Sequence, residues 1–442
     1  MYHSLIGKPS LRVGLVMGLL IGLSLLLLAA CGGGNSAKGG VDQEHNKSKS
    51  GGTAPNKSTR SFAGPASLAA CGGGNSAKGS AGQEHNKSKS GGTVSTDGLI
   101  VFHRELRSRD RDAILTMYPN GSHIRQITHP PEGWIDGSPA WSPDGTKVAF
   151  NRRVAARTCH GKRIMVVDVN TGHTRSVTHC GPYGGWTKEN PPPSSAPYCV
   201  GDAQPAFSAD GRSIAFRRII GSEDESSIVE GIFIVGLNGS DPHQVTNVDK
   251  RGELEYEDLG PAFSPDGKRL VFERTRLADY ASPSECRGCP RSHTAVFVQS
   301  LESSGSPEDA HRITPWKLNC QDHPEFSPNG HWLLFSCDAE GDNTSTNLYM
   351  VHPDGTGLHQ LTHWGCCDQT YEGSSFSPEF DDEGWGDIVA AHRPAYGGEG
   401  HADVYRMHID IEHGVQETVN LTKSKTHERA LSWGTYPPSA RQ

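Results

Sequence analysis

One phrase returns along this chain and limits what it can fold into. "DGSPAWSPDGTKVAF" begins at Asp136, and related phrases begin at Asp202, Asp258 and Asp322. They follow one another at intervals of roughly 50 to 70 residues. A phrase that recurs at such a period marks a repeated structural unit, and each unit needs its neighbours to bury its apolar face.

Each unit predicts four β-strands. A short apolar segment such as "PAWS" is followed by "SPDG", and a second segment such as "KVAF" comes next. A third segment such as "RIMVVDV" leads through "NTGH" to a fourth that ends in Thr. Alternating apolar residues, β-branched content and Gly/Asn/Asp turns indicate antiparallel strands. Pro and Gly in "SPDG" suit a type I turn closed by a left-handed residue.

Six such units are expected. First strands lie near Ala140, Ala206, Ala262, Glu325, Ser375 and Ala430. Fourth strands end near Thr128, Thr178, Thr246, Thr314, Thr362 and Thr422. "TDGLIVF" (96–102) reads as a second strand and "RALSW" (429–433) as a first strand, so the two should complete one blade. We therefore predict an all-β fold, a six-bladed β-propeller of four-stranded antiparallel blades, closed by N-terminal strands pairing with the C-terminal strand.

The unit "P-x-[WF]-S-P-D-G-x-x-[LIV]-x-F", with a following "[IV]-[YFM]-V" strand, resembles the TolB-like propeller family over residues 97–434. The fifth copy, "SSFSPEFDDEGWGDIVAA", departs through its longer turn. The family includes the periplasmic TolB component of an envelope complex, uncharacterised lipoproteins, and the non-catalytic propellers of some serine peptidases. The resemblance implies the fold more strongly than an activity.

The N-terminal region is expected to be a signal and a tether. Residues 1–30 carry Lys8, Arg12 and an uncharged run from Val13 that ends in "LAAC". This resembles a bacterial lipoprotein signal, with Cys31 as the lipidated residue; a retained transmembrane helix is the alternative. Residues 31–96 are a Gly/Ser/Lys/Asn tether that contains a 40-residue tandem duplication, and residues 97–442 form the propeller.

The net charge of the chain and its predicted export limit the classes of partner that we expect. The whole chain has a net charge of −8, although the tether is basic, so the propeller is acidic and nucleic acid is not an expected partner. We expect an extracytoplasmic monomer, bound to a membrane through its lipid anchor only, at the cell surface or the periplasmic face. An envelope protein, a peptide or a glycan is the expected partner.

Export also permits disulfides. The hairpin around Ser327–Gly330 places Cys320 opposite Cys337, which suits the short Cβ separation of a disulfide. Among Cys159, Cys180 and Cys199, the pair Cys159–Cys180 is preferred. Cys286 and Cys289 form a single CxxC, read as a local disulfide, or as metal ligands together with His293. Cys366 and Cys367 are expected to bond to partners elsewhere or to each other. Without Cys31 and Cys71 nine cysteines remain, and this odd number predicts at least one thiol that is free or forms an intermolecular bond.

An acidic residue precedes each first strand: Asp136, Asp202, Asp258, Asp322, Glu372 and Glu428. First strands line the channel of a propeller, so these carboxylates should ring its mouth. One interpretation is structural, with each acid fixing its own blade connection. The other is a cation site, for calcium or a cationic peptide end. His129, His179 and His363 are interpreted as surface residues, and "DAEGDNTSTN" (338–347) is only a weak match to a calcium loop.

The function predicted first is a lipid-anchored binding or scaffold module, which presents a loop-rich, disulfide-stapled propeller face to its partner. The sequence lacks G-x-S-x-G, H-E-x-x-H and a phosphate-binding loop, so the chain is predicted not to be an enzyme and to require no cofactor. The alternative is a propeller enzyme resembling a polysaccharide lyase, with a metal at the channel mouth.

Overall fold

The computed structural model describes residues 98–106, 111–155, 162–179, 198–221, 228–246, 256–276, 293–302, 309–338, 346–364, 369–393 and 401–435. The predicted signal, the tether and Cys31 lie outside these ranges. Within the ranges, no helix has both the length and the apolar character needed to cross a membrane.

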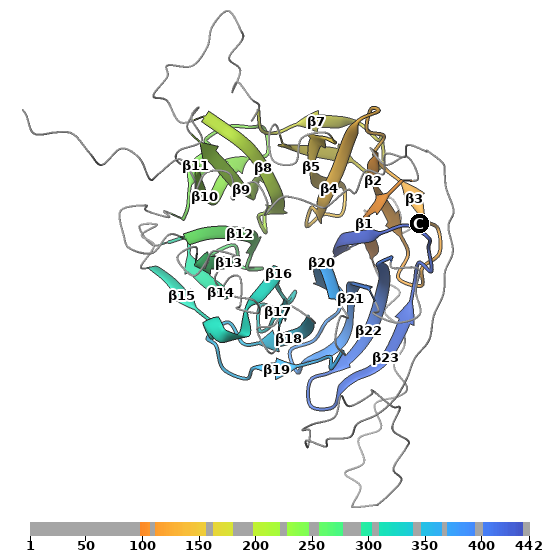
Figure 1. The fold of residues 1–442 in the computed structure, drawn as a ribbon, viewed down its shortest axis with the longest axis vertical. Helices are drawn as coiled ribbons and strands as arrows, with labels where there is room; N and C mark the ends of the chain where they lie inside the picture. Colours follow the sequence, from red (N-terminus) through yellow and green to blue (C-terminus); the bar gives the residue numbers. More distant parts are fainter. Residues whose placement is uncertain are drawn as a thin grey trace, which may run out of the picture. The chain divides into compact units, whose positions relative to one another are not determined.

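The propeller prediction is confirmed, with six four-stranded antiparallel blades arranged around a centre (Figure 1). The innermost strands, in blades 1 to 6, are β24 (Glu428–Gly434), β4 (Trp134–Trp141), β8 (Tyr198–Phe207), β12 (Tyr256–Phe263), β16 (Cys320–Phe326) and β20 (Gln369–Phe376). The second strands are β1 (Leu99–Glu105), β5 (Lys147–Val154), β9 (Ser213–Gly221), β13 (Arg269–Arg276), β17 (Leu333–Cys337) and β21 (Trp385–Arg393).

The outer half of each blade follows the same order. The third strands are β2 (Asp112–Met117), β6 (Arg163–Asp168), β10 (Ile228–Gly236), β14 (His293–Ser300), β18 (Asn347–Val351) and β22 (Asp403–Asp410). The fourth strands are β3 (Arg125–Gln126), β7 (Thr174–Ser176), β11 (His243–Gln244), β15 (Ala310–Arg312), β19 (His359–Gln360) and β23 (Gly414–Asn420). A single turn of 3₁₀ helix, Trp316–Leu318, precedes β16.

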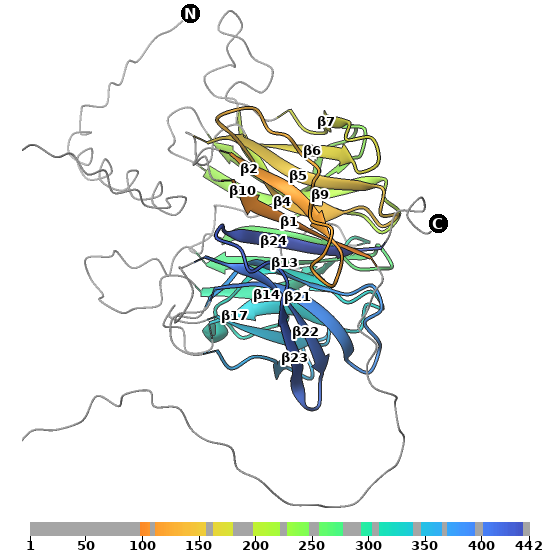
Figure 2. The same cartoon turned by 90° about the vertical axis from the view of Figure 1, so that its right-hand side faces the viewer.

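The ring closes as predicted. β1 pairs antiparallel with β24 from Leu99 opposite Gly434 to Arg104 opposite Glu428, and the two lie side by side in Figure 2. Each innermost strand also contacts the innermost strands of both neighbouring blades. One parallel bridge between β2 and β4 joins blades 1 and 2 into a continuous sheet. Residues from the two ends of the propeller therefore complete a single blade.

The repeated turn owes its shape to a Ser and an acid or amide. In the first copy, Ser142 Oγ donates to Asp144 Oδ1 at 2.6 Å and accepts from the Lys147 amide at 2.9 Å. Gly145 follows at a φ of 66°, which glycine adopts without steric cost. The same bonds recur at Ser208 and Ser264, and with Asn329 as acceptor at Ser327. These turns fix the register of the two inner strands in four blades.

The apolar core lies between blades. Ala149, Ile164 and Val166 of blade 2 pack against Phe207 and Phe216 of blade 3, for example. Similar clusters, each shared by two adjacent blades, fill the other junctions formed by the described residues. A blade therefore buries its apolar faces only when both neighbours are present, which is the physical reason for the repeat.

The threonine that ends each fourth strand has a specific partner. The hydroxyl of Thr246 accepts the Ile232 amide at 3.0 Å. Equivalent bonds of 2.9–3.0 Å join the third strands to Thr128, Thr178, Thr314, Thr362 and Thr422. Most fourth strands are only two or three residues long and make few backbone hydrogen bonds. The threonine side chain therefore adds a bond that holds the outer edge of the blade to the third strand.

Replacing Thr246 with Val should lower the free energy of unfolding by about 1–3 kcal/mol, because the buried Ile232 amide would lose its acceptor. Urea denaturation measures the loss. Thr418→Val, on the exposed surface of β23, is the control and should change stability by less than about 0.5 kcal/mol. Equal effects of the two substitutions would contradict the assigned role.

Candidate functional site at the central channel

Four of the six predicted acids are buried in ion pairs. Asp136, Asp202 and Asp258 each receive two bonds of 2.6–2.9 Å from the arginine sixteen residues later, which are Arg152, Arg218 and Arg274. Each acid and its arginine are register partners on the two inner strands. Glu428 pairs in the same position with Arg104, through Nε at 2.7 Å. We call this arrangement the clasp.

An aromatic ring packs near each clasp arginine. Each arginine carbon Cζ lies 5.0–5.5 Å from the ring centroid of the phenylalanine two residues before it. All four carboxylate side chains have no exposed surface. A buried carboxylate that already receives a guanidinium has little capacity left for a cation, so this geometry favours the structural interpretation of these four acids.

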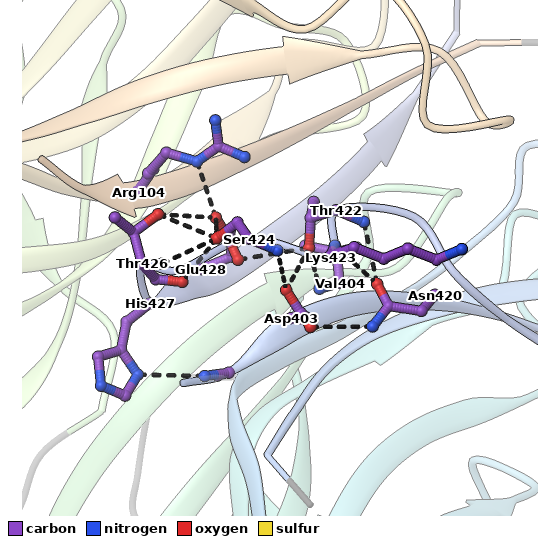
Figure 3. A network of polar contacts seen from close by, with 11 residues as sticks. Arg104, Asp403, Val404, Asn420, Thr422, Lys423, Ser424, Thr426, His427 and Glu428 are labelled. Atoms are coloured by element: carbon purple, nitrogen blue, oxygen red, sulfur yellow. Dashed lines mark hydrogen bonds and ion pairs between the residues drawn. The ribbon is translucent and has the colours of Figure 1, made fainter. Parts of the chain in front are cut away.

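Figure 3 shows the clasp of the closing blade, which has a larger network. Glu428 Oε1 accepts from Arg104 Nε and from Ser424 Oγ at 2.6 Å. Thr422 Oγ1 lies 2.9 Å from Asp403 Oδ1 and 3.3 Å from Glu428 Oε2, and its single proton can serve only one of them. Burial raises the pKa of Glu428, and the Asp403 charge adds to the shift. The two ends of the ring are thus held by a cooperative polar cluster.

Blades 5 and 6 depart from the clasp. In blade 5 the register partners are Cys320 and Cys337, and in blade 6 they are Thr370 and His392. Asp322 therefore lies in the irregular stretch between Gln321 and Glu325, and Glu372 lies in the one between Thr370 and Ser374. The expectation that all six acids occupy equivalent positions is wrong, because these two inner strands bulge by one residue more than the others.

The predicted disulfide Cys320–Cys337 is confirmed. It occupies the register position that the ion pair occupies in blades 1 to 4, and both cysteines are fully buried. A covalent bond thus replaces the clasp in this blade. Cys159, Cys180, Cys286, Cys289, Cys366 and Cys367 lie outside the described residues, as do Glu340 and Asp342, and only the backbone of Cys199 is described.

The histidines singled out from the sequence do not converge. His129 and His363 are exposed at the ends of different blades, as the surface interpretation requires, and His179 is likewise exposed. Among the residues that the structure describes, no three His, Cys, Asp or Glu side chains come together in an arrangement that could hold a metal ion. The carboxylates of the clasp therefore do not fit a shared cation site.

The centre of the ring carries a feature that the sequence analysis missed. Each innermost strand holds one residue at positive φ in its bulge: Ser138, Gln204, Gly260, His323, Gly373 and Ala430. Five of these six blades contribute to a small cavity, lined by Ser138, Pro139, Gln204, Pro205, His323, Gly373, Ala430 and Leu431. Its volume of about 30 Å³ holds one or two water molecules.

Backbone strain concentrates at this ring. Gln204 at a φ of 54° and His323 at 56° adopt a conformation that costs most non-glycine residues free energy. Such residues persist only where the surrounding structure holds them, and they cluster at ligand sites. A bulge also leaves backbone groups outside the strand ladder. The available sequence signal was the proline in "D-x-x-P" of blades 2 to 4, since a proline inside a strand often marks a bulge.

Glu325 is another departure from the repeat. It occupies the position of Ala140, Ala206 and Ala262, and its Oε1 accepts the Phe376 amide of blade 6 at 2.6 Å. Ser375 accepts the Trp433 amide at 2.9 Å in the corresponding way. Desolvation by the surrounding protein raises the pKa of Glu325 to about 8, and its hydrogen bonds only partly offset the rise. This carboxyl therefore carries a proton at neutral pH.

A second hollow lies on the outside of the ring, between β19 of blade 5 and the β22–β23 hairpin of blade 6. Its volume is about 540 Å³, and Leu361, Met407 and Val415 are among its lining residues, with His359 and His413. No feature of the sequence predicted this groove, because its two walls come from different repeats.

Known structures resemble this propeller. No family model matches the chain. TolB from Acinetobacter baumannii matches with a TM-score of 0.51 and 16% identity, over 76% of this chain and 66% of that chain. The fold is a TolB-like propeller. An oligogalacturonate lyase in complex with manganese matches less closely, with a TM-score of 0.39 and 14% identity, over 76% of this chain and 74% of that chain.

One curated relative has a name that bears on activity. An uncharacterized peptidase of Bacillus subtilis, YuxL, is 24% identical over 230 residues, which is 47% of this chain and 30% of that protein. The match thus spans less than a third of the relative's length. The prediction that the chain is not an enzyme is contradicted by this similarity to a peptidase. That prediction was wrong because missing motifs exclude only the enzyme classes to which those motifs belong.

Replacing Glu325 with Gln should remove a pH dependence of stability. The folded state holds a proton on Glu325 up to about pH 8, whereas an unfolded glutamate releases it near pH 4.5, so the wild-type protein loses stability between these values as pH rises. The variant should equal wild type at pH 5 and exceed it by at least about 1 kcal/mol at pH 9. Chemical denaturation at pH 5 and pH 9 measures the free energies of unfolding, and Glu417→Gln at an exposed site is the control. A stability difference between Glu325→Gln and wild type that is the same at both pH values would contradict the prediction.

Replacing both Cys320 and Cys337 with Ala should lower the free energy of unfolding by about 3 kcal/mol, because the bond closes a loop between residues 17 apart. Urea denaturation under non-reducing conditions measures the loss. A loss below about 1 kcal/mol would show that the blade does not depend on the covalent bond.

Proposed function

We propose that this protein is a lipid-anchored, extracytoplasmic propeller that binds peptide segments at its central channel, in the service of a peptidase-type activity. The observation that carries the proposal is the ring of strained bulge residues at the channel, taken with the similarity to a peptidase. The chain covers only part of that relative, so the peptide chemistry is assigned to this chain by proposal.

The bulges supply the chemistry that a peptide needs. A bound peptide exposes amide donors and carbonyl acceptors, and it binds best to groups that no strand ladder has used. The bulge residues Ser138, Gln204 and His323 add a hydroxyl, an amide and an imidazole to such backbone groups. Pro139 and Pro205 beside them give apolar contact without further donors.

The anchor and location belong to the same proposal. Cys31, after the apolar run and "LAAC", would carry the lipid, and the basic tether would hold the acidic propeller away from the membrane. The confirmed disulfide supports an oxidising compartment, since such bonds persist outside the cytoplasm. A monomer remains our expectation.

A propeller enzyme that uses a divalent cation at the channel is the second candidate. The observation that favours it is the wider bulge of the innermost strands of blades 5 and 6, where Cys337 and His392 stand in place of the clasp arginine.

Peptide binding should weaken at least tenfold when Ser138 is replaced with Tyr, because the larger side chain would occupy the channel. Fluorescence anisotropy with a labelled, degenerate octapeptide pool measures binding, and mass spectrometry of the same pool detects hydrolysis. Thr418→Tyr, on the outermost strand of blade 6, is the control and should bind as wild type does.

If Ser138→Tyr binds peptide as tightly as wild type, the channel is not the peptide-binding site. Absence of peptide binding by wild type, together with oligogalacturonate turnover that requires manganese or calcium, would favour the second candidate.

A further inference from the structure

Two side chains meet across the central channel. Gln204 Nε2 of blade 3 lies 3.1 Å from His323 Nε2 of blade 5, so the contact passes over the intervening blade 4. Both residues are strained bulge residues, and both line the small central cavity. Neither the clasp nor the disulfide involves them. Their side chains thus meet at the border of a cavity of about 30 Å³ at the centre of the ring.

A third bond fixes the orientation of the Gln204 amide. The Gly260 N–H of blade 4 donates to Gln204 Oε1 at 3.0 Å, so the oxygen must face Gly260. The NH₂ group therefore faces His323, and a donor there requires an acceptor on the imidazole. His323 Nε2 must carry its lone pair, with the proton on Nδ1. The closed arrangement thus selects one tautomer of neutral histidine.

The other side of His323 is also fixed. Its backbone N–H donates to Glu273 Oε1 at 2.5 Å, and Glu273 on β13 is 5% exposed. The carboxyl groups on the four innermost strands β8, β12, β16 and β20 are Asp202, Glu257, Asp258, Asp322, Glu325 and Glu372, of which Asp202 and Asp258 are held in clasps. The cations near this set are the clasp arginines, each engaged by its own acid.

We propose that Gln204 and His323 form a latch that closes the central channel when His323 is neutral and opens when it is protonated. Protonation places an N–H on Nε2 against the NH₂ of Gln204, so two donors face each other. The contact must then break, or the amide must turn and abandon the Gly260 N–H. Imidazole is the side chain whose protonation state ordinarily changes between pH 5 and 8, so histidine suits such a latch.

The latch gives the channel a pH-dependent entrance. Its chemistry stands on the contacts alone, and its role in admitting a peptide rests on the proposed function. When the latch opens, the side-chain NH₂ of Gln204 and the protonated imidazole of His323 no longer face each other. Both groups can then donate hydrogen bonds to a ligand. A ligand group that accepts hydrogen bonds, such as a peptide carboxylate, would bind the open state preferentially and hold it open.

Nuclear magnetic resonance of the full processed protein tests the latch without a ligand. At pH 7.5 the ¹⁵N shift of His323 Nε2 should be that of an unprotonated nitrogen, and the Gly260 amide should be protected from exchange. At pH 5.5 Nε2 should be protonated, and Gly260 protection should fall at least tenfold after correction for the intrinsic rate.

Two variants of the latch residues and one control variant test the assigned roles of Gln204 and His323. His323→Asn tolerates the left-handed backbone and cannot titrate here, so Gly260 protection should no longer depend on pH. Gln204→Ala should abolish protection at both pH values. His243→Asn, at an exposed site on β11, is the matched control and should behave as wild type does.

A protonated Nε2 at pH 7.5 would overturn the latch, as would the same pH dependence of Gly260 protection in wild type and His323→Asn. Peptide anisotropy at both pH values separates the two proposals. If Gly260 protection falls with pH as expected but no peptide binds at either pH, the proposed function is wrong and the latch is still supported.

Discussion

The buried pair of a carboxylate and a guanidinium is the interaction on which the other contacts depend. Asp136, Asp202 and Asp258 each lie in the first half of an innermost strand and are held by an arginine near the end of the second strand. The pair ties together the two ends of a hairpin whose turn is fixed by Ser and Asp at the opposite side. Breaking either partner would leave a buried, unpaired charge, which is why the sequence repeats both.

This fastening explains why the acids recur without forming a cation ring. Each of the four clasp carboxylates is paired within its own blade, so its recurrence reflects a structural need of blades 1 to 4. The departures are then informative. Blade 5 replaces the pair by Cys320–Cys337, and blades 5 and 6 have the wider bulges. His323 and Glu325 also lie in blade 5, so the chemistry not explained by the repeat gathers in one sector.

That sector links the fold to the proposed function. Glu325 is protonated at neutral pH because protein surrounds it, and it joins blade 5 to blade 6. His323 contacts Gln204 across the channel and Glu273 of the preceding blade. A ligand in the central cavity would contact His323 of this blade, and the proposed function assigns a peptide to that place.

Much of the architecture followed from the residues of one repeat. The six blades, the closure by β1 and β24, the turn geometry and the disulfide could be predicted, because each depends on local periodicity or on pairing within one hairpin. The prediction failed for Asp322 and Glu372, since a bulge wider by one residue shifts the partner while leaving the spacing to the next strand almost unchanged.

The sequence by itself therefore determined the unit, the number of units and the way the ring closes. Only the tertiary structure decided what each polar side chain meets. The clasp needed the register of two strands, Glu325 needed the amide of the next blade, and Gln204 needed a histidine 119 residues away. These contacts depend on how blades approach one another around a common centre, and no local pattern of residues records that distance.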